Sequence, residues 1–84
     1  MDLNEKFEQA VEGVQKLDSR PSNENLLKLY GLYKQATEGD VSGDRPGGFD
    51  FKAIAKYDSW ASLRGTSKEE AMTAYIELVN ELSS

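Results

Sequence analysis

The sequence predicts an all-α protein, and three observations support this fold class. Apolar residues recur at helical spacing in four separate segments. Residues typical of helix caps stand before or after most of these segments. No segment shows the strict alternation of apolar and polar residues that a half-buried strand requires. We therefore expect four helices packed in a bundle.

The first predicted helix has an apolar stripe whose members are spaced by four, four, three and three residues: Leu3, Phe7, Val11, Val14 and Leu17. Gly13 weakens this helix by about 1 kcal/mol relative to alanine, but the stripe continues past it. Pro21 marks the break, because the residue before a proline disfavours the helical conformation.

The second predicted helix starts at Ser22 or Asn23, either of which suits the N-cap, and Gly39 suits its C-terminal cap. The third starts with Asp50 as its cap and ends at Gly65. The fourth has the clearest start signal, a capping box of either Thr66 with Glu69 or Ser67 with Glu70. Its apolar stripe is Met72, Tyr75, Ile76, Val79 and Leu82.

The stretch from Gly39 to Gly48 has the composition of a long loop, with four glycines and a proline. A connection of this length can carry the chain back across a bundle, so that the second and third helices run parallel. An up-down-down-up arrangement is compatible with this loop, although spacing alone does not establish it.

Composition favours a binding module over an enzyme. The chain has 84 residues and neither cysteine nor histidine, so it lacks thiolate chemistry, disulfides and the commonest general base and metal ligand. We expect one domain over residues 1–84. No metal site is predicted, because Arg45 and Phe51 stand where an EF-hand loop starting at Asp40 needs glycine and glutamate.

The net charge of −5 is unevenly distributed. Residues 28–68 contain seven Lys or Arg against five acids, whereas the two ends together contain three against ten. This pattern disfavours nucleic acid binding but is compatible with a compact anionic ligand. The acidic start of the chain and the lack of a long apolar run predict a soluble, cytoplasmic protein without stable membrane insertion.

Two groups of residues are candidates for anion binding. Tyr30 and Lys34 lie four residues apart on one helix face, with Tyr33 adjacent, and offer an ammonium group and aromatic surfaces. Lys52 and Lys56 repeat this spacing in the third helix. In both cases the alternative is that the aromatic residues pack in the core while the lysines face solvent, and Tyr75 is most simply a core residue.

Several strings then resemble the acyl-coenzyme A binding protein family in order and spacing, over about residues 7–82. They are Tyr-Gly-Leu-Tyr-Lys-Gln-Ala-Thr-Glu-Gly-Asp at 30–40, Arg-Pro-Gly at 45–47, Asp-Phe at 50–51, Ala-Lys-Tyr-Asp-Ser-Trp at 55–60, Gly-Thr-Ser-Lys-Glu-Glu-Ala-Met at 65–72 and Ala-Tyr-Ile at 74–76.

The resemblance implies an up-down-down-up four-helix bundle that binds medium- and long-chain acyl-CoA thioesters as a carrier, without a cofactor. It implies a monomer that transiently contacts enzymes using acyl-CoA. The ligand-binding residues implied by it are Tyr30, Gly31, Leu32, Tyr33, Lys34, Lys52, Lys56 and Tyr75. The chain departs from the pattern at Tyr57, where many members have tryptophan, and at Gln15, where some have lysine.

A competing hypothesis from the residues is a helical protein-interaction module without acyl-CoA binding. Tyr33, Tyr57 and Trp60 would then form a protein-binding surface, since aromatic residues are frequent at interface hot spots.

Overall fold

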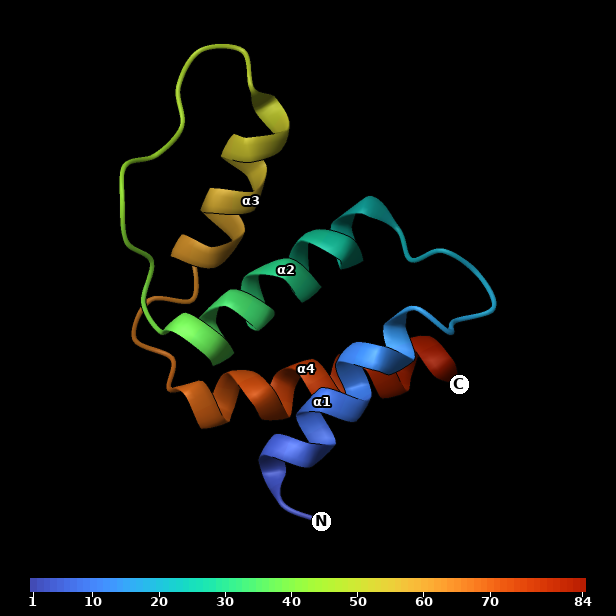
Figure 1. Ribbon diagram of the computed structural model, residues 1–84. Helices are drawn as coiled ribbons and strands as arrows, with labels where there is room; N and C mark the ends of the chain where they lie inside the picture. The colour runs from blue at the N-terminus through green and yellow to red at the C-terminus, as the bar shows by residue number, and fades with distance from the viewer.

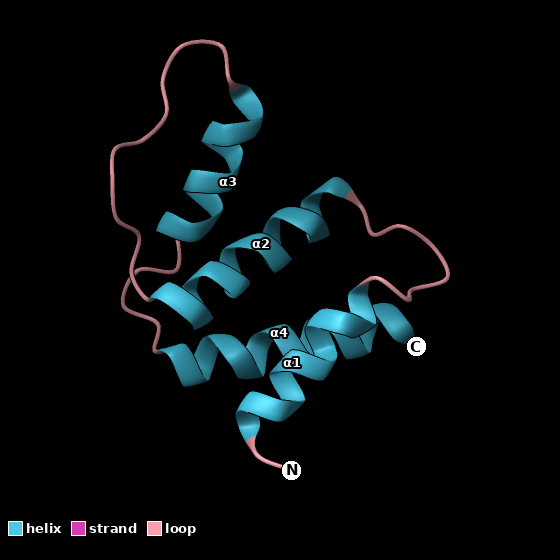
Figure 2. Ribbon diagram, in the orientation of Figure 1, coloured by secondary structure: helices cyan, strands magenta, loops and turns pink.

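The computed structural model describes residues 1–84 and contains four helices and no strand (Figures 1 and 2). The helices are α1 (Leu3–Val14), α2 (Asn23–Glu38), α3 (Phe51–Ala61) and α4 (Lys68–Ser83). The all-α fold class is therefore confirmed.

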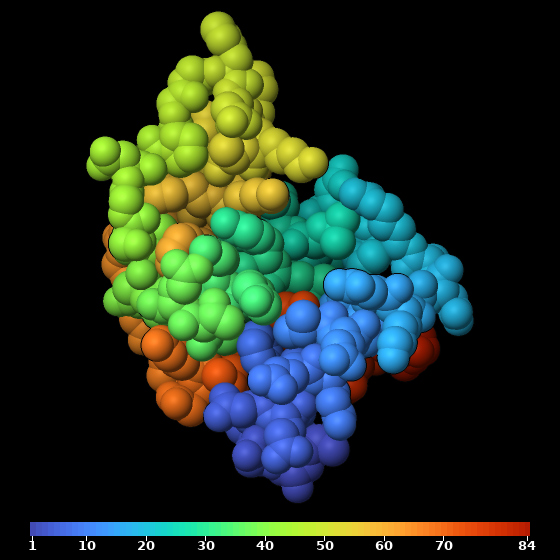
Figure 3. Space-filling model, viewed as in Figure 1, coloured from blue at the N-terminus to red at the C-terminus, as the bar shows by residue number.

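The helices have the up-down-down-up arrangement. In Figure 1, α2 and α3 run in broadly the same direction, and α1 and α4 run in the opposite one. The loop after α2 returns to the far end of the molecule before α3 begins, as its length allows. Helix α4 packs against both α1 and α2, whereas α3 packs against α2 alone. The molecule is consequently elongated, 41 × 28 × 15 Å, with α3 projecting from one side (Figure 3).

The predicted helix starts are confirmed by their capping hydrogen bonds. The Ser22 hydroxyl accepts from the backbone N–H of Asn25 at 3.1 Å, and the Asp50 carboxylate accepts from that of Ala53 at 3.2 Å. At α4 the capping box forms between Ser67 and Glu70, with both of its hydrogen bonds present.

Two predicted helix ends were wrong. Helix α1 ends at Val14. Leu17 lies in a turn whose N–H groups donate to the carbonyl groups three residues back, instead of four as in an α-helix. Helix α3 ends at Ala61, four residues before Gly65, and the intervening residues form similar tight turns. Gly65 adopts a φ of 91°, which suits glycine, but it ends this turn and not the helix.

The core lies where α1, α2 and α4 meet. Its buried residues are Phe7, Ala10, Leu29, Ala36, Ala71, Tyr75 and Val79. Trp60 is the only buried residue of α3. The position of α3 is therefore held by its packing against α2 and by the loop that connects the two helices.

Three α3 side chains hold the long loop in place. The Trp60 indole N–H donates to the Gly39 carbonyl at 2.8 Å, and the Tyr57 hydroxyl donates to that of Gly43 at 3.2 Å. Asp58 accepts two hydrogen bonds from the Arg45 guanidinium, both at 2.9 Å. This pairing raises the pKa of Arg45 and lowers the pKa of Asp58.

A buried amide fixes the junction between α2 and α4. The Gln35 side chain is fully buried, and its Nε2 donates to Asp40 Oδ1 at 2.9 Å and to the Thr66 carbonyl at 2.7 Å. The same Asp40 oxygen accepts from the Gly65 N–H at 2.9 Å. Both hydrogen bonds lower the pKa of Asp40, and the one from Gly65 has the larger effect.

The close approach of α2 and α3 depends on Gly31. A Cβ at this position would lie 2.8 Å from the Ser59 carbonyl oxygen and 2.9 Å from the Ser59 carbonyl carbon. Because these are backbone atoms, any side chain at residue 31 must push the two helices apart.

We expect Gly31→Ala to lower the free energy of unfolding by about 1–3 kcal/mol, the usual cost of overpacking. Urea titration measures the effect. Gly13→Ala is the matched control, because its Cβ would meet Val79 Cγ1 at an ordinary 3.7 Å, and it should stabilise the protein by about 0.5–1 kcal/mol. Equal effects of the two substitutions would contradict this role of Gly31.

Candidate functional site

Tyr30 on α2 and Lys56 on α3 meet where the two helices pack side by side. The Lys56 ammonium nitrogen lies 5.3 Å from the centroid of the Tyr30 ring, within the range of a cation–π contact. Lys56 is exposed and forms no ion pair, so its charge is available to a ligand. The fold thus brings together one residue from each of the two candidate groups, and their role in ligand binding stays a prediction.

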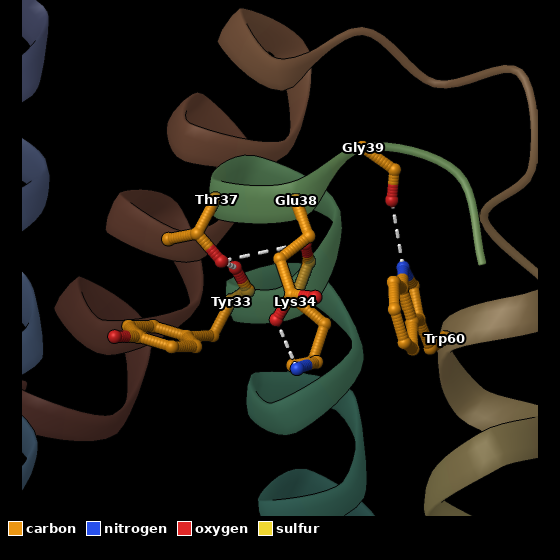
Figure 4. Close-up of polar contacts among 6 residues, drawn as sticks. All are labelled: Tyr33, Lys34, Thr37, Glu38, Gly39 and Trp60. Atoms are coloured by element: carbon orange, nitrogen blue, oxygen red, sulfur yellow. Dashed lines mark hydrogen bonds and ion pairs between the residues drawn. The ribbon is translucent and has the colours of Figure 1, made fainter. Parts of the chain in front are cut away.

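Lys34 lies one helical turn after Tyr30, between an aromatic ring and a carboxylate. Its ammonium nitrogen is 4.9 Å from the centroid of the Trp60 ring and forms a hydrogen-bonded ion pair with Glu38 (Figure 4). The hydrogen bond that the Lys34 ammonium donates to the Glu38 carboxylate is the main reason that the pKa of Lys34 is raised. Lys34 therefore stays cationic at neutral pH, but its charge is already paired.

Tyr33 of α2 and Tyr75 of α4 lie near Phe7 of α1, on another side of α2 from Lys34. Figure 4 shows the Tyr33 ring and the Lys34 side chain extending in different directions from the helix. The Tyr33 ring stacks on Phe7 at 6.0 Å between centroids, and Phe7 meets Tyr75 edge to face at 5.1 Å. Burial is the main cause of the raised pKa of the Tyr75 hydroxyl.

These rings lie beside a surface cavity of about 610 Å³ between α1, α2 and the start of α4. Phe7 and Tyr33 line it, with Met72 and Lys68 from α4. Tyr33 is 41% exposed and accessible to a ligand, whereas Tyr75 is only 5% exposed. The predicted residues thus fall on two neighbouring surfaces that share α2.

The remaining predicted residues have different surroundings. Gly31 is buried against Ser59, and Leu32 packs against the core and lines a shallow cavity beside Leu63. Lys52 is exposed in the first turn of α3, without an ion pair. A ligand role for these three residues, as for the other five, stays a prediction.

Two partners of Lys34, Glu38 and Trp60, were not predicted from the sequence. Glu38 follows Lys34 by four residues, so the spacing that indicates an ion pair was visible in the sequence. The position of Trp60 beneath Lys34 had no comparable signal, because it depends on how α3 packs against α2.

No group of His, Cys, Asp and Glu side chains is arranged to hold a metal ion. None of the four helices combines the length and the apolar character needed to cross a bilayer.

The sequence and the fold match known proteins across nearly the whole chain. The family model described as acyl CoA binding protein matches residues 4–79. The chain is 54% identical over 82 residues to an acyl-CoA-binding protein of Brassica napus, covering 98% of this chain and 89% of the relative. Its identity to an acyl-CoA-binding protein of Gossypium hirsutum is 50%, covering 98% and 92% of the two chains.

Solved structures give the same result. The crystal structure of Oryza sativa acyl-CoA-binding protein 2 superposes with a TM-score of 0.91 at 49% identity, covering 96% of this chain and 90% of the other. The protein from Moniliophthora perniciosa gives 0.89 at 45% identity, with coverage of 98% and 80%. The helical bundle is therefore of the acyl-CoA-binding type. This chain belongs to the acyl-CoA-binding protein family.

Proposed function

We propose that this protein binds medium- and long-chain acyl-CoA thioesters and acts as an acyl-CoA carrier. The observation that carries the proposal is the surface where α2 meets α3, on which Lys34 and Lys56 lie beside aromatic rings. Ammonium groups suit the phosphates of coenzyme A, and the exposed faces of tyrosine rings suit its adenine. The names of the relatives support this ligand class.

In the proposed complex, Tyr30, Lys34 and Lys56 bind the 3′-phosphate and the adenine. Tyr33 extends the aromatic surface toward the cavity beside Phe7. Tyr75 supports this surface by packing against the Phe7 ring, on which Tyr33 stacks. Lys52 adds a further cation in α3. Lys34 and Lys56 come from different helices, so the site depends on the α2–α3 packing that Gly31 permits.

The acyl chain needs an apolar surface next to the nucleotide site. Leu29 of α2 is buried in the core and is not accessible to a ligand. Leu26, Leu27 and Ile54 are half-buried on the two paired helices. Each CH₂ group removed from water by such a surface contributes about 0.8 kcal/mol.

A carrier needs no covalent step, so a site without cysteine or histidine is sufficient. We propose that the protein acts in the cytoplasm as a monomer, without enzymatic activity. It would limit hydrolysis of the thioester and deliver it to enzymes that use acyl-CoA. Transient contacts with those enzymes are part of this proposal.

No observation favours the interaction-module hypothesis. Trp60 is buried, and the Tyr57 hydroxyl is bonded to the loop, which leaves Tyr33 as the exposed member of the proposed aromatic surface.

Calorimetric titration tests the proposed function. We expect palmitoyl-CoA to bind more tightly than CoA alone, and free palmitate to bind weakly, because both ends of the ligand contribute. Comparable binding of free palmitate, or no binding of the thioester, would refute the proposal. Release of CoA on incubation with palmitoyl-CoA would refute the non-enzymatic part.

Glu38 should reduce the affinity, because its carboxylate pairs with Lys34 and repels a phosphate. We expect Glu38→Gln to tighten binding of palmitoyl-CoA by about threefold to fivefold at low salt. Glu24→Gln is the matched control, since Glu24 pairs with Lys28 on the same helix and outside the site. A gain of equal size in both variants would indicate a general effect of net charge and not competition at Lys34.

A further inference from the structure

The indole ring of Trp60 on α3 has a fixed place beside Lys34 on α2. Its side chain is 7% exposed, and its N–H donates to the Gly39 carbonyl, at the end of α2, at 2.8 Å. A ring that is buried and hydrogen-bonded in this way cannot turn aside. The Lys34 ammonium nitrogen lies 4.9 Å from the ring centroid, within the range of a cation–π contact (Figure 4). The surface that meets Lys34 is therefore already in place before a ligand binds.

A second contact of this kind joins the same two helices with the roles exchanged. Lys56 of α3 lies over the ring of Tyr30 of α2, at 5.3 Å. Each of the two lysines thus rests on an aromatic ring from the opposite helix. Tyr30 is half-buried and also offers a hydroxyl to a ligand, whereas Trp60 is buried and its single N–H is already bonded. Trp60 can consequently act on a ligand only through Lys34.

The two partners of Lys34 behave differently when a phosphate binds. Glu38 pairs with the ammonium as a charge, so it competes with a phosphate for the same N–H donors. The Trp60 ring has no net charge and meets the ammonium with its face. An ammonium group has three N–H donors, so one side of it can rest on the ring while the others turn to phosphate oxygens. The ring contact can persist in the complex, whereas the pair with Glu38 must loosen.

We propose that Trp60 is a positioning residue for acyl-CoA binding, whose ring face holds the Lys34 ammonium at the place where the ligand phosphate binds. A lysine side chain has many rotamers, and fixing it when a ligand binds costs free energy. The ring limits these rotamers in the unliganded protein, so a smaller part of this cost falls on the binding step. The inference rests on the proposed function, because it adds to the same phosphate site a residue that does not touch the ligand.

Fluorinated tryptophans test the proposal, because the chain contains one tryptophan and each analogue enters at residue 60 alone. Mono-, di- and trifluorotryptophan keep the ring shape and the N–H donor but withdraw electron density from the ring face. We expect the affinity for palmitoyl-CoA, measured by calorimetry, to fall stepwise along this series, by about threefold to fivefold in total. The melting temperature should change little, since packing and the hydrogen bond to Gly39 are kept.

The same series in the Lys34→Ala variant is the matched control. Without the ammonium group, fluorination should leave the remaining affinity for palmitoyl-CoA unchanged. An equal decline in both backgrounds would overturn the proposal, because Trp60 would then act through the fold or touch the ligand itself.

Nuclear magnetic resonance locates the ammonium group before and after binding. We expect the Cε protons of Lys34 to be shifted upfield by the indole ring in the free protein and to stay so in saturating CoA. Lys28 is the reference, because it makes no cation–π contact. An upfield shift that disappears with CoA would overturn the proposal, since the ammonium would then leave the ring to reach the phosphate.

Failure of the proposed function has a different signature in these measurements. If the protein with ordinary tryptophan did not bind palmitoyl-CoA, the proposed function would be wrong, and the role of Trp60 with it. If this protein bound the ligand and fluorination had no effect on its affinity, only the role of Trp60 would be wrong.

Discussion

Replacing Lys34 with alanine is expected to weaken binding of palmitoyl-CoA by more than 1 kcal/mol, which corresponds to about fivefold to tenfold or more in Kd. The substitution removes the ammonium group that lies over Trp60 and that we assign to the ligand phosphate. Because Lys34 is paired with Glu38 at the surface, the melting temperature should change little. Calorimetry and thermal denaturation measure the two effects.

Lys28→Ala is the matched control for this substitution. Lys28 lies on the same helix, is exposed and also pairs with a glutamate, but it lies outside the proposed phosphate site. Equal losses of affinity in the two variants would indicate that only net charge matters. Unchanged affinity in Lys34→Ala would show that the assignment is wrong at this position.

Replacing Trp60 with alanine should have the largest effect on stability, about 3–5 kcal/mol in the free energy of unfolding. Trp60 is the one buried side chain of α3, and its indole N–H holds the loop through the Gly39 carbonyl. Without it, α3 loses its main anchor on α2. Urea titration measures the loss of stability.

Trp60→Phe separates the two roles of this side chain. Phenylalanine keeps most of the apolar packing but cannot donate to Gly39, so the loss should be smaller and limited to the hydrogen bond and part of the ring volume. If both variants were as stable as the wild type, the account of how α3 is attached would be incorrect.

Local signals in the sequence were sufficient to predict most helix starts. A capping residue and its partner lie within three positions of each other, so Asp50 was visible without knowledge of the fold. At the second and fourth helices the sequence left two neighbouring caps open, and the structure has Ser22 and the Ser67–Glu70 box. Helix ends were predicted less well. Neither Leu17 nor Gly65 marks a helix end, because short turns with three-residue hydrogen bonds begin earlier in both cases.

Long-range contacts were not predictable from spacing. Gln35 is a polar residue within a helical segment, and its complete burial depends on the Thr66 carbonyl, 31 positions away. The distribution of Tyr30, Tyr33 and Tyr75 over two surfaces likewise depends on which neighbour each side of α2 packs against. The family resemblance named these residues but left their arrangement open.

The central claim is that the lysines and aromatic rings of α2 and α3 bind the nucleotide end of acyl-CoA. A crystal structure with bound palmitoyl-CoA tests it most directly. We expect phosphate oxygens within hydrogen-bond distance of the ammonium groups of Lys34 and Lys56, with the adenine on a tyrosine ring. Nucleotide density elsewhere, with both lysines free of phosphate, would contradict it.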